Sequence, residues 1–349
     1  MRSARVRMWG LAVALAIDGA IAGWGFADPR RPPVTVALVV GPFTACAVGS
    51  AATTFGLTAY ALVLGFALAL RDHALGTGYR IAELGVVLVG GAVATWLAVE
   101  RAEREHRLVD VAAVAETAQR AILPVIPERV ADLEVAARFV SATREAWVGG
   151  DLYELLATEH GVRVILGDAQ GKGINAVRLS AMVLGAFREA AWSRSDLVEV
   201  AWVLDEHVQR FAEEPGDFVT AVLVDFTPDG AMRVVNCGHP DPVVLSRDDV
   251  RVLHASRRSL PLGLGVDPIA DTHEFGPGDR VMLYTDGAEE ARNAAGEYFD
   301  LVAGLVECLR IALLEECLDR FTELVGTFVA GEYRDDVALM VVERSVPVR

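Results

Sequence analysis

The segments Val148-Gly149-Gly150-Asp151 and Val162-Arg-Val-Ile-Leu-Gly-Asp-Ala-Gln-Gly-Lys-Gly173 decide the fold of this chain. Val162 to Leu166 is a short apolar run rich in β-branched residues, which predicts a buried strand. This strand ends in an aspartate and a tight turn, where Gly171 and Gly173 permit positive φ. The apolar residues from Ile174 to Trp192 then recur with helical spacing. We therefore expect a strand, a carboxylate at its end, a tight turn and a helix.

Two more strands are expected beside aspartates further along the chain, in Val281-Met-Leu-Tyr-Thr-Asp-Gly287 and Asp335-Asp-Val-Ala-Leu-Met-Val-Val342. A single aspartate at a strand end is usually a turn former or a helix cap. Four aspartates from separate segments, with no cysteine or histidine among them, form an all-oxygen set instead. Such a set suits Mg²⁺ or Mn²⁺ and does not suit zinc. The four residues are Asp151, Asp168, Asp286 and Asp335.

Other short motifs accompany these aspartates along the chain. In this combination and order, the sequence from Pro127 to Arg344 resembles the metal-dependent (PPM-type) serine/threonine protein phosphatases. Within them it is similar to the bacterial branch typified by stage II sporulation protein E and the stress-response sigma-factor phosphatases. The resemblance implies an α+β fold, a four-layer α-β-β-α sandwich. The matching motifs are Val148-Gly-Gly-Asp-Leu-Tyr153, Gly167-Asp-Ala-Gln-Gly-Lys-Gly173, Phe218-Val-Thr-Ala-Val-Leu223, Asn236-Cys-Gly-His-Pro240, Leu260-Pro-Leu-Gly-Leu264, Tyr284-Thr-Asp-Gly287 and Asp335-Asp-Val-Ala-Leu339.

The resemblance also implies a reaction and a site. Two ions of Mn²⁺ or Mg²⁺ activate a water for hydrolysis of a phosphomonoester and neutralise the charge of the phosphoryl group. By the same resemblance, Asp151 contributes to one metal shell, and Asp168 bridges both ions with help from the backbone carbonyl of Ala169. Asp286 and Asp335 complete the other shell. These four aspartates are the predicted catalytic residues.

The sequence leaves open the roles of three residues near the predicted site. Asp336 is a neighbour of the four aspartates and is expected to cap or orient them, without being assigned as a ligand. Lys172 stands where the larger family has histidine, and it either steers the substrate phosphate or is a solvated turn residue. His239 is either a general acid or a neutral histidine hydrogen-bonded to backbone. The spacing of a P-loop is absent around Lys172, so nucleotide binding is not expected there.

The first 100 residues predict a membrane region. Met8 to Phe26 is apolar except for Asp18, Val34 to Leu70 has no charged residue, and Ile81 to Val99 has one near its start. A helix needs about 20 residues to cross a bilayer, so the middle stretch predicts a hairpin with its turn at Gly49-Ser50. We expect an all-α region of about four transmembrane helices and a multi-pass protein of the cell membrane. Asp18 is expected to face the bundle interior, as a structural group or as part of a sensing site.

Residues 101–126 predict an amphipathic helix that continues from the last membrane helix and ends at Pro124 and Pro127. Its apolar stripe comprises Val111, Val114, Ala118 and Ile122. The helix is either a simple linker or a stalk that pairs two chains into a homodimer. Residues 127–349 form the predicted catalytic domain. Arginines before the first and after the last membrane helix place this domain in the cytoplasm.

The chain up to Arg107 has 10 Arg and 7 Asp or Glu, a balance of +3, so the net charge of −16 leaves −19 for the part after it. Nucleic acid is therefore not an expected partner, because its phosphate backbone requires a basic face. The sequence predicts a membrane-anchored protein serine/threonine phosphatase, and by resemblance its substrate is a phosphorylated anti-sigma-factor antagonist. One alternative is a catalytically inactive PPM-fold sensor or scaffold. Another is a transport component, which would require more membrane helices and more polar residues within them.

Overall fold

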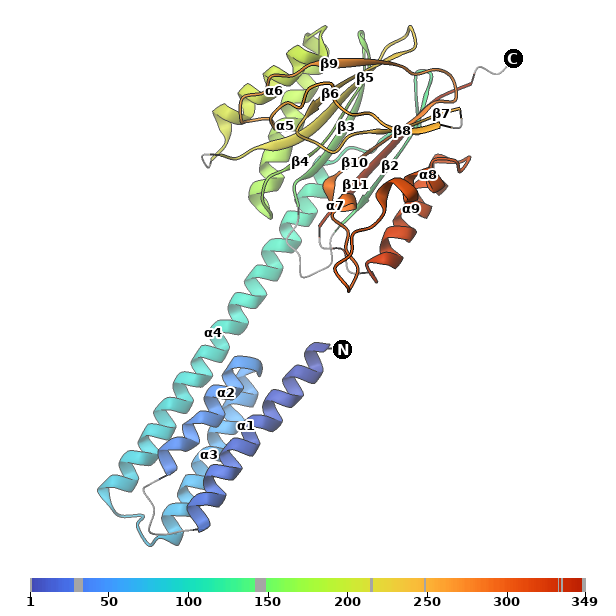
Figure 1. The fold of residues 1–349 in the computed structure, drawn as a ribbon. Helices are drawn as coiled ribbons and strands as arrows, with labels where there is room; N and C mark the ends of the chain where they lie inside the picture. Colours follow the sequence, from blue (N-terminus) through green and yellow to red (C-terminus); the bar gives the residue numbers. More distant parts are fainter. Residues whose placement is uncertain are drawn as a thin grey trace. The chain divides into compact units, whose positions relative to one another are not determined.

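The computed structural model describes residues 2–27, 34–141, 149–213, 216–247, 249–331, 333 and 335–346, without the side chains of 2–7, 105–106 and 108–113. Val148 of the first predicted motif therefore lies outside the described residues. The chain divides into two compact units, Met1–Asp110 and Val111–Arg349. Helix α4, Gly78–Ile122, contributes residues to both units (Figure 1).

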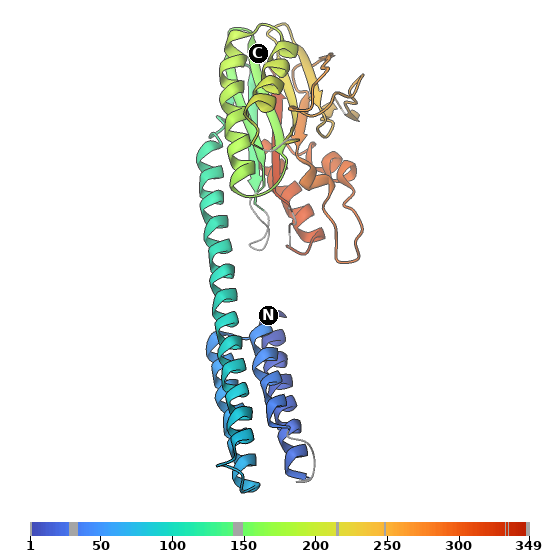
Figure 2. The same ribbon diagram turned by 90° about the vertical axis from the view of Figure 1, so that its left-hand side faces the viewer.

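The first unit consists of helices. Helix α1, Arg2–Ala27, precedes a 3₁₀ segment, Thr35–Val39, which continues directly into α2, Val40–Val48. Helix α3, Ala51–Arg71, follows the predicted turn, and the first part of α4 lies beside it (Figure 2). The Ser50 side chain accepts a hydrogen bond of 3.2 Å from the Thr53 backbone N–H, as expected for a helix N-cap. The predicted hairpin with a turn at Gly49-Ser50 is confirmed.

Three helical stretches are long and apolar enough to cross a membrane, namely Met8–Ala27, Ala51–Arg71 and Gly78–Arg104. The fourth apolar helical stretch, Thr35–Val48, is shorter. With five 3₁₀ and nine α-helical residues, it extends about 24 Å, compared with a hydrocarbon core of about 30 Å. The predicted count of about four spans thus corresponds to three full-length helices and one short helix.

Asp18 explains how the short helix begins inside this unit. Its side chain is fully buried, and its Oδ1 accepts a hydrogen bond of 3.2 Å from the Gly41 N–H in the first turn of α2. Val39 provides no side-chain cap, and Pro42 has no N–H to offer. A Cβ at Gly41 would lie 2.1 Å from the Asp18 carboxylate, so only glycine permits this approach. The predicted structural role of Asp18 is that of a remote N-cap.

The second unit has two antiparallel sheets between helices (Figure 1). Sheet A has the order β1-β2-β11-β10-β7-β8, and sheet B has the order β3-β4-β5-β6-β9. Helices α5 and α6 cover sheet B, and α8 and α9 cover sheet A. The elements of this unit are β1 Arg129–Val130, β2 Leu133–Val140, β3 Asp151–Thr158, β4 Gly161–Ala169, α5 Ile174–Ser193, α6 Leu197–Phe211, β5 Val219–Phe226, β6 Ala231–Cys237, β7 Val243–Ser246, β8 Asp249–Val252, β9 Ala270–Glu274, β10 Arg280–Tyr284, α7 Asp286–Glu289, α8 Leu301–Cys308, α9 Leu314–Phe328 and β11 Val337–Arg344.

Each of the three spaces between layers has its own apolar cluster. Strand β4 shows how one segment serves two of them. Val164 and Leu166 point into the space between the sheets, whereas Ile165 points toward α5 and α6. Successive side chains of a strand alternate between its two faces, and both faces of this strand are covered. The run of apolar residues on β4 therefore follows from its place in the sandwich, and the predicted four-layer α-β-β-α fold is confirmed.

Two buried arginines attach helix ends to the sheets. Arg163 on β4 donates to backbone carbonyls just beyond the last turn of α5, including that of Ser195 at 2.7 Å. Arg280 on β10 donates in the same way to the carbonyls of Leu309 and Ala312 after α8, at 2.9 and 2.8 Å. These carbonyls lie in the segment that separates α8 from α9. The sequence predicts helix from Leu301 to Ala330. This prediction is wrong between α8 and α9, because Arg280 binds backbone oxygens that a continuous helix would use internally.

Candidate metal centre

Strands β3 and β4 bring the first two predicted aspartates together. They pair in antiparallel register with Asp151 opposite Asp168 at one end of sheet B. Gly150 lies so close to the next strand that a Cβ there would stand 2.2 Å from the carbonyl oxygen of Ala169. The same residues exchange a backbone hydrogen bond, from the Ala169 N–H to the Gly150 carbonyl at 3.1 Å. The Gly-Gly-Asp motif thus serves a close approach of two backbones, which a larger residue would prevent.

Sheet A supplies the other two aspartates from the adjacent ends of β10 and β11. Asp286 follows β10 as the first residue of the short helix α7, and Asp335 lies just before β11. A Cβ at Gly287 would lie 2.0 Å from the carbonyl oxygen of Asp336, so the Asp-Gly pair also permits a close backbone approach. All four predicted aspartates therefore reach the same end of the sandwich, two from each sheet.

Hydrogen bonds between the two sheets fix this arrangement. The hydroxyl of Thr285 at the end of β10 donates to Oδ2 of Asp151 on β3 at 2.8 Å, and the N–H of Ala338 donates to the same hydroxyl at 2.9 Å. Oδ2 of Asp336 accepts the Gly149 N–H at 2.9 Å. Asp336 therefore orients the Gly-Gly-Asp segment, in agreement with the orienting role expected for it. Thr285 was missed in the sequence, although it stands in the Tyr-Thr-Asp-Gly motif.

The carboxylates of the cluster repel one another and raise one another's pKa values. Burial, followed by repulsion from Asp286, Asp335 and Asp336, raises the pKa of Asp168 to about 7. Burial, followed by repulsion from Asp168, raises the pKa of Asp151 well above its ordinary value. Several carboxylates at one buried place resist ionising together unless positive charge is brought to them. A hard divalent cation provides that charge and prefers oxygen ligands.

The donor set fits such an ion, although its ligands do not yet converge. Among the described residues, no three His, Cys, Asp or Glu side chains form a ready metal cage. The ammonium of Lys172 lies 3.1 Å from Oδ2 of Asp335, with both side chains partly exposed. Lys172 therefore pairs with one of the candidate ligands. The carboxylates are close enough to raise one another's pKa values.

Comparison with known proteins identifies the domain. A family model described as stage II sporulation protein E matches residues 158–345, which is more than half of the chain. The chain belongs to the stage II sporulation protein E family. The match includes Asp168, Asp286 and Asp335, whereas Asp151 precedes it.

Solved structures share the fold of this stage II sporulation protein E-family domain. The RsbU and RsbW domains of a Mycobacterium tuberculosis protein match at 24% identity and a TM-score of 0.54, over 65% of this chain and 64% of that one. The SiaA-PP2C domain of Pseudomonas aeruginosa matches at 19% identity and 0.57, over 70% and 98% of the two chains. The PP2C phosphatase domain of Bacillus subtilis SpoIIE, with a fragment of its regulatory domain, matches at 17% and 0.51, over 62% and 64%. This chain thus spans less than two thirds of the first and third structures. The second unit has the PPM phosphatase fold.

The end of α4 contacts the backbone of one candidate metal ligand. Gln119, which is almost fully buried, donates from Nε2 to the backbone carbonyl of Asp151 at 3.3 Å. Ala118 and Ile122 pack with Ala115 against Val177 on α5. Two residues of the predicted dimer stripe are therefore occupied within the same chain, whereas Val114 is exposed and the side chain of Val111 lies outside the description. The contact of Gln119 was not foreseen, because nothing in the sequence links it to Asp151.

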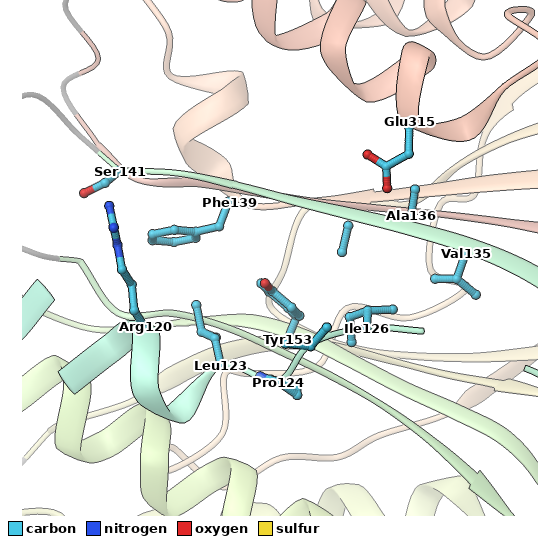
Figure 3. Close-up of a pocket in the computed structure, with 12 residues that line it drawn as sticks. Arg120, Leu123, Pro124, Ile126, Val135, Ala136, Phe139, Ser141, Tyr153 and Glu315 are labelled. Atoms are coloured by element: carbon cyan, nitrogen blue, oxygen red, sulfur yellow. The ribbon is translucent and has the colours of Figure 1, made fainter. Parts of the chain in front are cut away.

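The cavities of the second unit differ in whether a candidate metal ligand lines them. One, of about 420 Å³, opens between the end of α4 and the edges of the two sheets, and Phe139 and Tyr153 project into it (Figure 3). Arg120 and Glu315 stand at its rim. A second cavity, of about 450 Å³, has Asp286 in its wall together with Thr220, His239, Tyr284, His254 and Arg258. The second cavity thus includes a candidate metal ligand, and a third cavity, of about 300 Å³, has Asp335 in its wall. Both therefore border the centre.

Proposed function

We propose that the protein is a membrane-anchored, Mn²⁺- or Mg²⁺-dependent phosphatase that hydrolyses phosphoserine or phosphothreonine on a regulatory protein. One observation carries this proposal: four aspartates from four segments meet at one end of a PPM-fold sandwich, where their repulsion calls for divalent cations. Family membership and the shared fold support it. The absence of histidine and cysteine from the set favours hard cations.

The proposed ligands are Asp151, Asp168, Asp286, Asp335 and the backbone carbonyl of Ala169. When bound, two divalent ions lower the pKa of a water and neutralise the charge of the phosphoryl group. The chain itself holds the ligands in place. Strand register sets Asp151 opposite Asp168, and the Thr285 hydroxyl fixes the rotamer of Asp151 through the bond to Oδ2. Carboxylates that are already oriented need less rearrangement when the reaction begins.

Lys172 is proposed to attract the phosphate of the substrate. Its ammonium stands at the partly exposed rim of the carboxylate cluster, paired with Asp335. If a cation takes over the charge of Asp335, the ammonium becomes available to an incoming phosphate. A lysine acts as a point charge toward phosphate and does not need a fixed geometry. This role is consistent with the position of Lys172 in a turn between β4 and α5.

The cavity beside Asp286 favours a protein substrate. It extends from the carboxylates to the exposed side chains of His254 and Arg258. A phosphorylated side chain can thus enter the centre while its flanking residues lie in the cavity. We propose an anti-sigma-factor antagonist as the substrate, and the support is the resemblance to stress-response sigma-factor phosphatases together with the family assignment.

The proposed anchoring is a multi-pass arrangement with the catalytic unit in the cytoplasm. The support is the set of apolar helices and the arginines that flank it. Homodimerisation through α4 is also proposed, with exposed Val114 as the part of the stripe that remains for a second chain. The bond from Gln119 to Asp151 supports a further proposal, that the position of α4 influences the centre.

The test is release of phosphate from a phosphoserine protein by the full chain in detergent, with and without Mn²⁺. We expect Mn²⁺-dependent release by the wild type and a loss of at least about 100-fold in Asp286→Asn, because a metal ligand is removed. Asp267→Asn is the matched control, since its side chain is exposed and paired only with Arg257. A folded wild type that binds Mn²⁺ but releases no phosphate would support the inactive sensor or scaffold instead.

A further inference from the structure

His239 occupies a buried position between the two sheets, in the loop after β6. Its Nε2 lies 3.1 Å from the backbone carbonyl of Tyr284, and its Nδ1 lies 3.0 Å from the hydroxyl of Thr220. A carbonyl only accepts, so Nε2 carries the ring proton and Nδ1 accepts the proton of the hydroxyl. The two contacts together select one neutral tautomer.

The surrounding motif holds the imidazole in this place. The Asn236 side chain accepts the His239 N–H at 2.8 Å and donates to the His239 carbonyl at 2.9 Å. Gly238 has φ of +72°, and a Cβ there would meet the ring of Pro261 at 2.8 Å. The Asn-Cys-Gly-His-Pro segment is thus a built turn that presents one side chain to the space between the sheets. This turn gives a structural reason for the Asn-Cys-Gly-His-Pro motif, which contains none of the proposed metal ligands.

The two partners of His239 adjoin metal ligands from different sheets. Thr220 on β5 pairs in register with Asp168 on β4, and its hydroxyl also lies 3.4 Å from the Asp168 carbonyl. Tyr284 is the last residue of β10 and stands two residues before Asp286. The imidazole therefore spans the gap between the strand that carries the proposed bridging ligand and the strand that leads to Asp286.

Burial keeps this imidazole neutral. His239 is 6% exposed, and burial lowers its pKa to about 3, against a smaller opposing effect of the Tyr284 carbonyl. A histidine that stays neutral in the physiological range has no proton to give as a general acid. Of the two interpretations expected from the sequence, the contacts match the neutral histidine bonded to backbone.

We propose that His239 is a positioning residue that sets the separation of Asp168 and Asp286 by linking Thr220 on sheet B to the Tyr284 backbone on sheet A. The inference rests on the proposed two-ion centre and goes beyond it, because it assigns a role to a residue outside the proposed ligand set. Partners that orient metal ligands are typically worth about 10- to 100-fold in metal affinity. Loss of the link should therefore weaken ion binding before it changes the chemistry of the reaction.

The test measures Mn²⁺ binding to the full chain in detergent, by the electron paramagnetic resonance signal of free Mn²⁺. We expect His239→Ala and Thr220→Val to raise the Mn²⁺ dissociation constant by about 10- to 100-fold. Thr220→Ser, which keeps the hydroxyl, should remain near the wild-type affinity. His239→Gln, whose amide can still donate to the Tyr284 carbonyl, should recover part of the loss. His207→Ala is the matched control, because His207 bonds only within its own helix at Val203.

Wild-type affinity in both His239→Ala and Thr220→Val would overturn the inference. Thr220→Val carries the test alone if His239→Ala does not fold, since it removes a single hydroxyl. A wild type that binds no Mn²⁺ would instead overturn the proposed metal centre. The pH profile gives an independent check. At saturating Mn²⁺, Thr220→Val should keep the wild-type profile between about pH 6 and pH 8, because a histidine with its pKa near 3 does not titrate there. If Thr220→Val shifts the alkaline limb of the pH–activity profile, His239 is a general acid.

Discussion

Replacing Asp168 with asparagine in the fragment 111–349 should stabilise the fold when metal is absent and fail to do so when Mn²⁺ is present. In the metal-free fold, Asp168 is half-buried and faces Asp286, Asp335 and Asp336. Asparagine has nearly the same shape and removes the charge that these neighbours repel. When Mn²⁺ is present, the Asp168 carboxylate attracts the ion. Replacing it with asparagine therefore removes the stabilisation that ion binding gives to the fold. The sign of the effect therefore depends on the metal.

The magnitude follows from the pKa of Asp168, which rises from 3.8 to about 7 in the fold. A carboxyl with a raised pKa contributes stability that is fully present below the unfolded value and is lost as the pH rises through the folded value. At about 1.4 kcal/mol per pKa unit, the wild type should lose about 2 kcal/mol of unfolding free energy between about pH 5.5 and pH 8 from this group. Asp168→Asn should lack this loss.

The assay is urea unfolding followed by circular dichroism, at both pH values and with a chelator present. Asp267→Asn, exposed and remote from the cluster, should keep the wild-type pH dependence. In Mn²⁺ at about 100 times its dissociation constant, the wild type should gain about 2.7 kcal/mol, and Asp168→Asn should gain little. The reasoning is refuted if the metal-free wild type and Asp168→Asn show the same pH dependence, or if Asp168→Asn is the less stable protein at pH 8 without metal.

Three further predictions concern the backbone, the helix and the membrane. Gly150→Ala places a Cβ 2.2 Å from a carbonyl oxygen and should cost about 1–3 kcal/mol of unfolding free energy, whereas Gly185→Ala, with open space around it, should not destabilise the fold; equal stability would contradict the close approach. Inserting two residues after Ala113 rotates the downstream helix by roughly half a turn, and inserting seven nearly restores it, so only the first should change phosphatase activity in membranes; equal activity in all three proteins would make α4 a passive tether. Reporter fusions at Leu75 and Arg349 should report the outside and the cytoplasm respectively, and the reverse pattern would contradict the cytoplasmic placement of the catalytic unit.

The four aspartates were predictable because each lies next to a strand end marked by apolar residues and glycine. Such local patterns also predicted the positive φ at Gly171 and Gly173, which the structure has, and the hairpin turn at Gly49-Ser50. The candidate metal centre is thus built from features that each segment carries within itself. Their order along the chain added the family resemblance.

The supporting contacts were not predictable, because they join residues that are far apart in the sequence. Thr285 and Asp151 are separated by 134 positions, and no periodicity records their hydrogen bond. Gln119 stands in an amphipathic helix, where its polar side chain favours an exposed position, yet it is buried against a strand. The break between α8 and α9 was missed for the same reason, since the buried Arg280 that binds its carbonyls belongs to another element.

The central claim, a two-ion centre held by the four aspartates, is tested most directly by counting bound ions. Crystals of the fragment 111–349 soaked in Mn²⁺ should show two anomalous peaks about 4 Å apart, with Asp168 between them and Asp151, Asp286 and Asp335 around them. Crystals of Asp168→Asn should show at most one peak. Two peaks that persist without the Asp168 carboxylate, or ions bound away from these four side chains, would contradict the account.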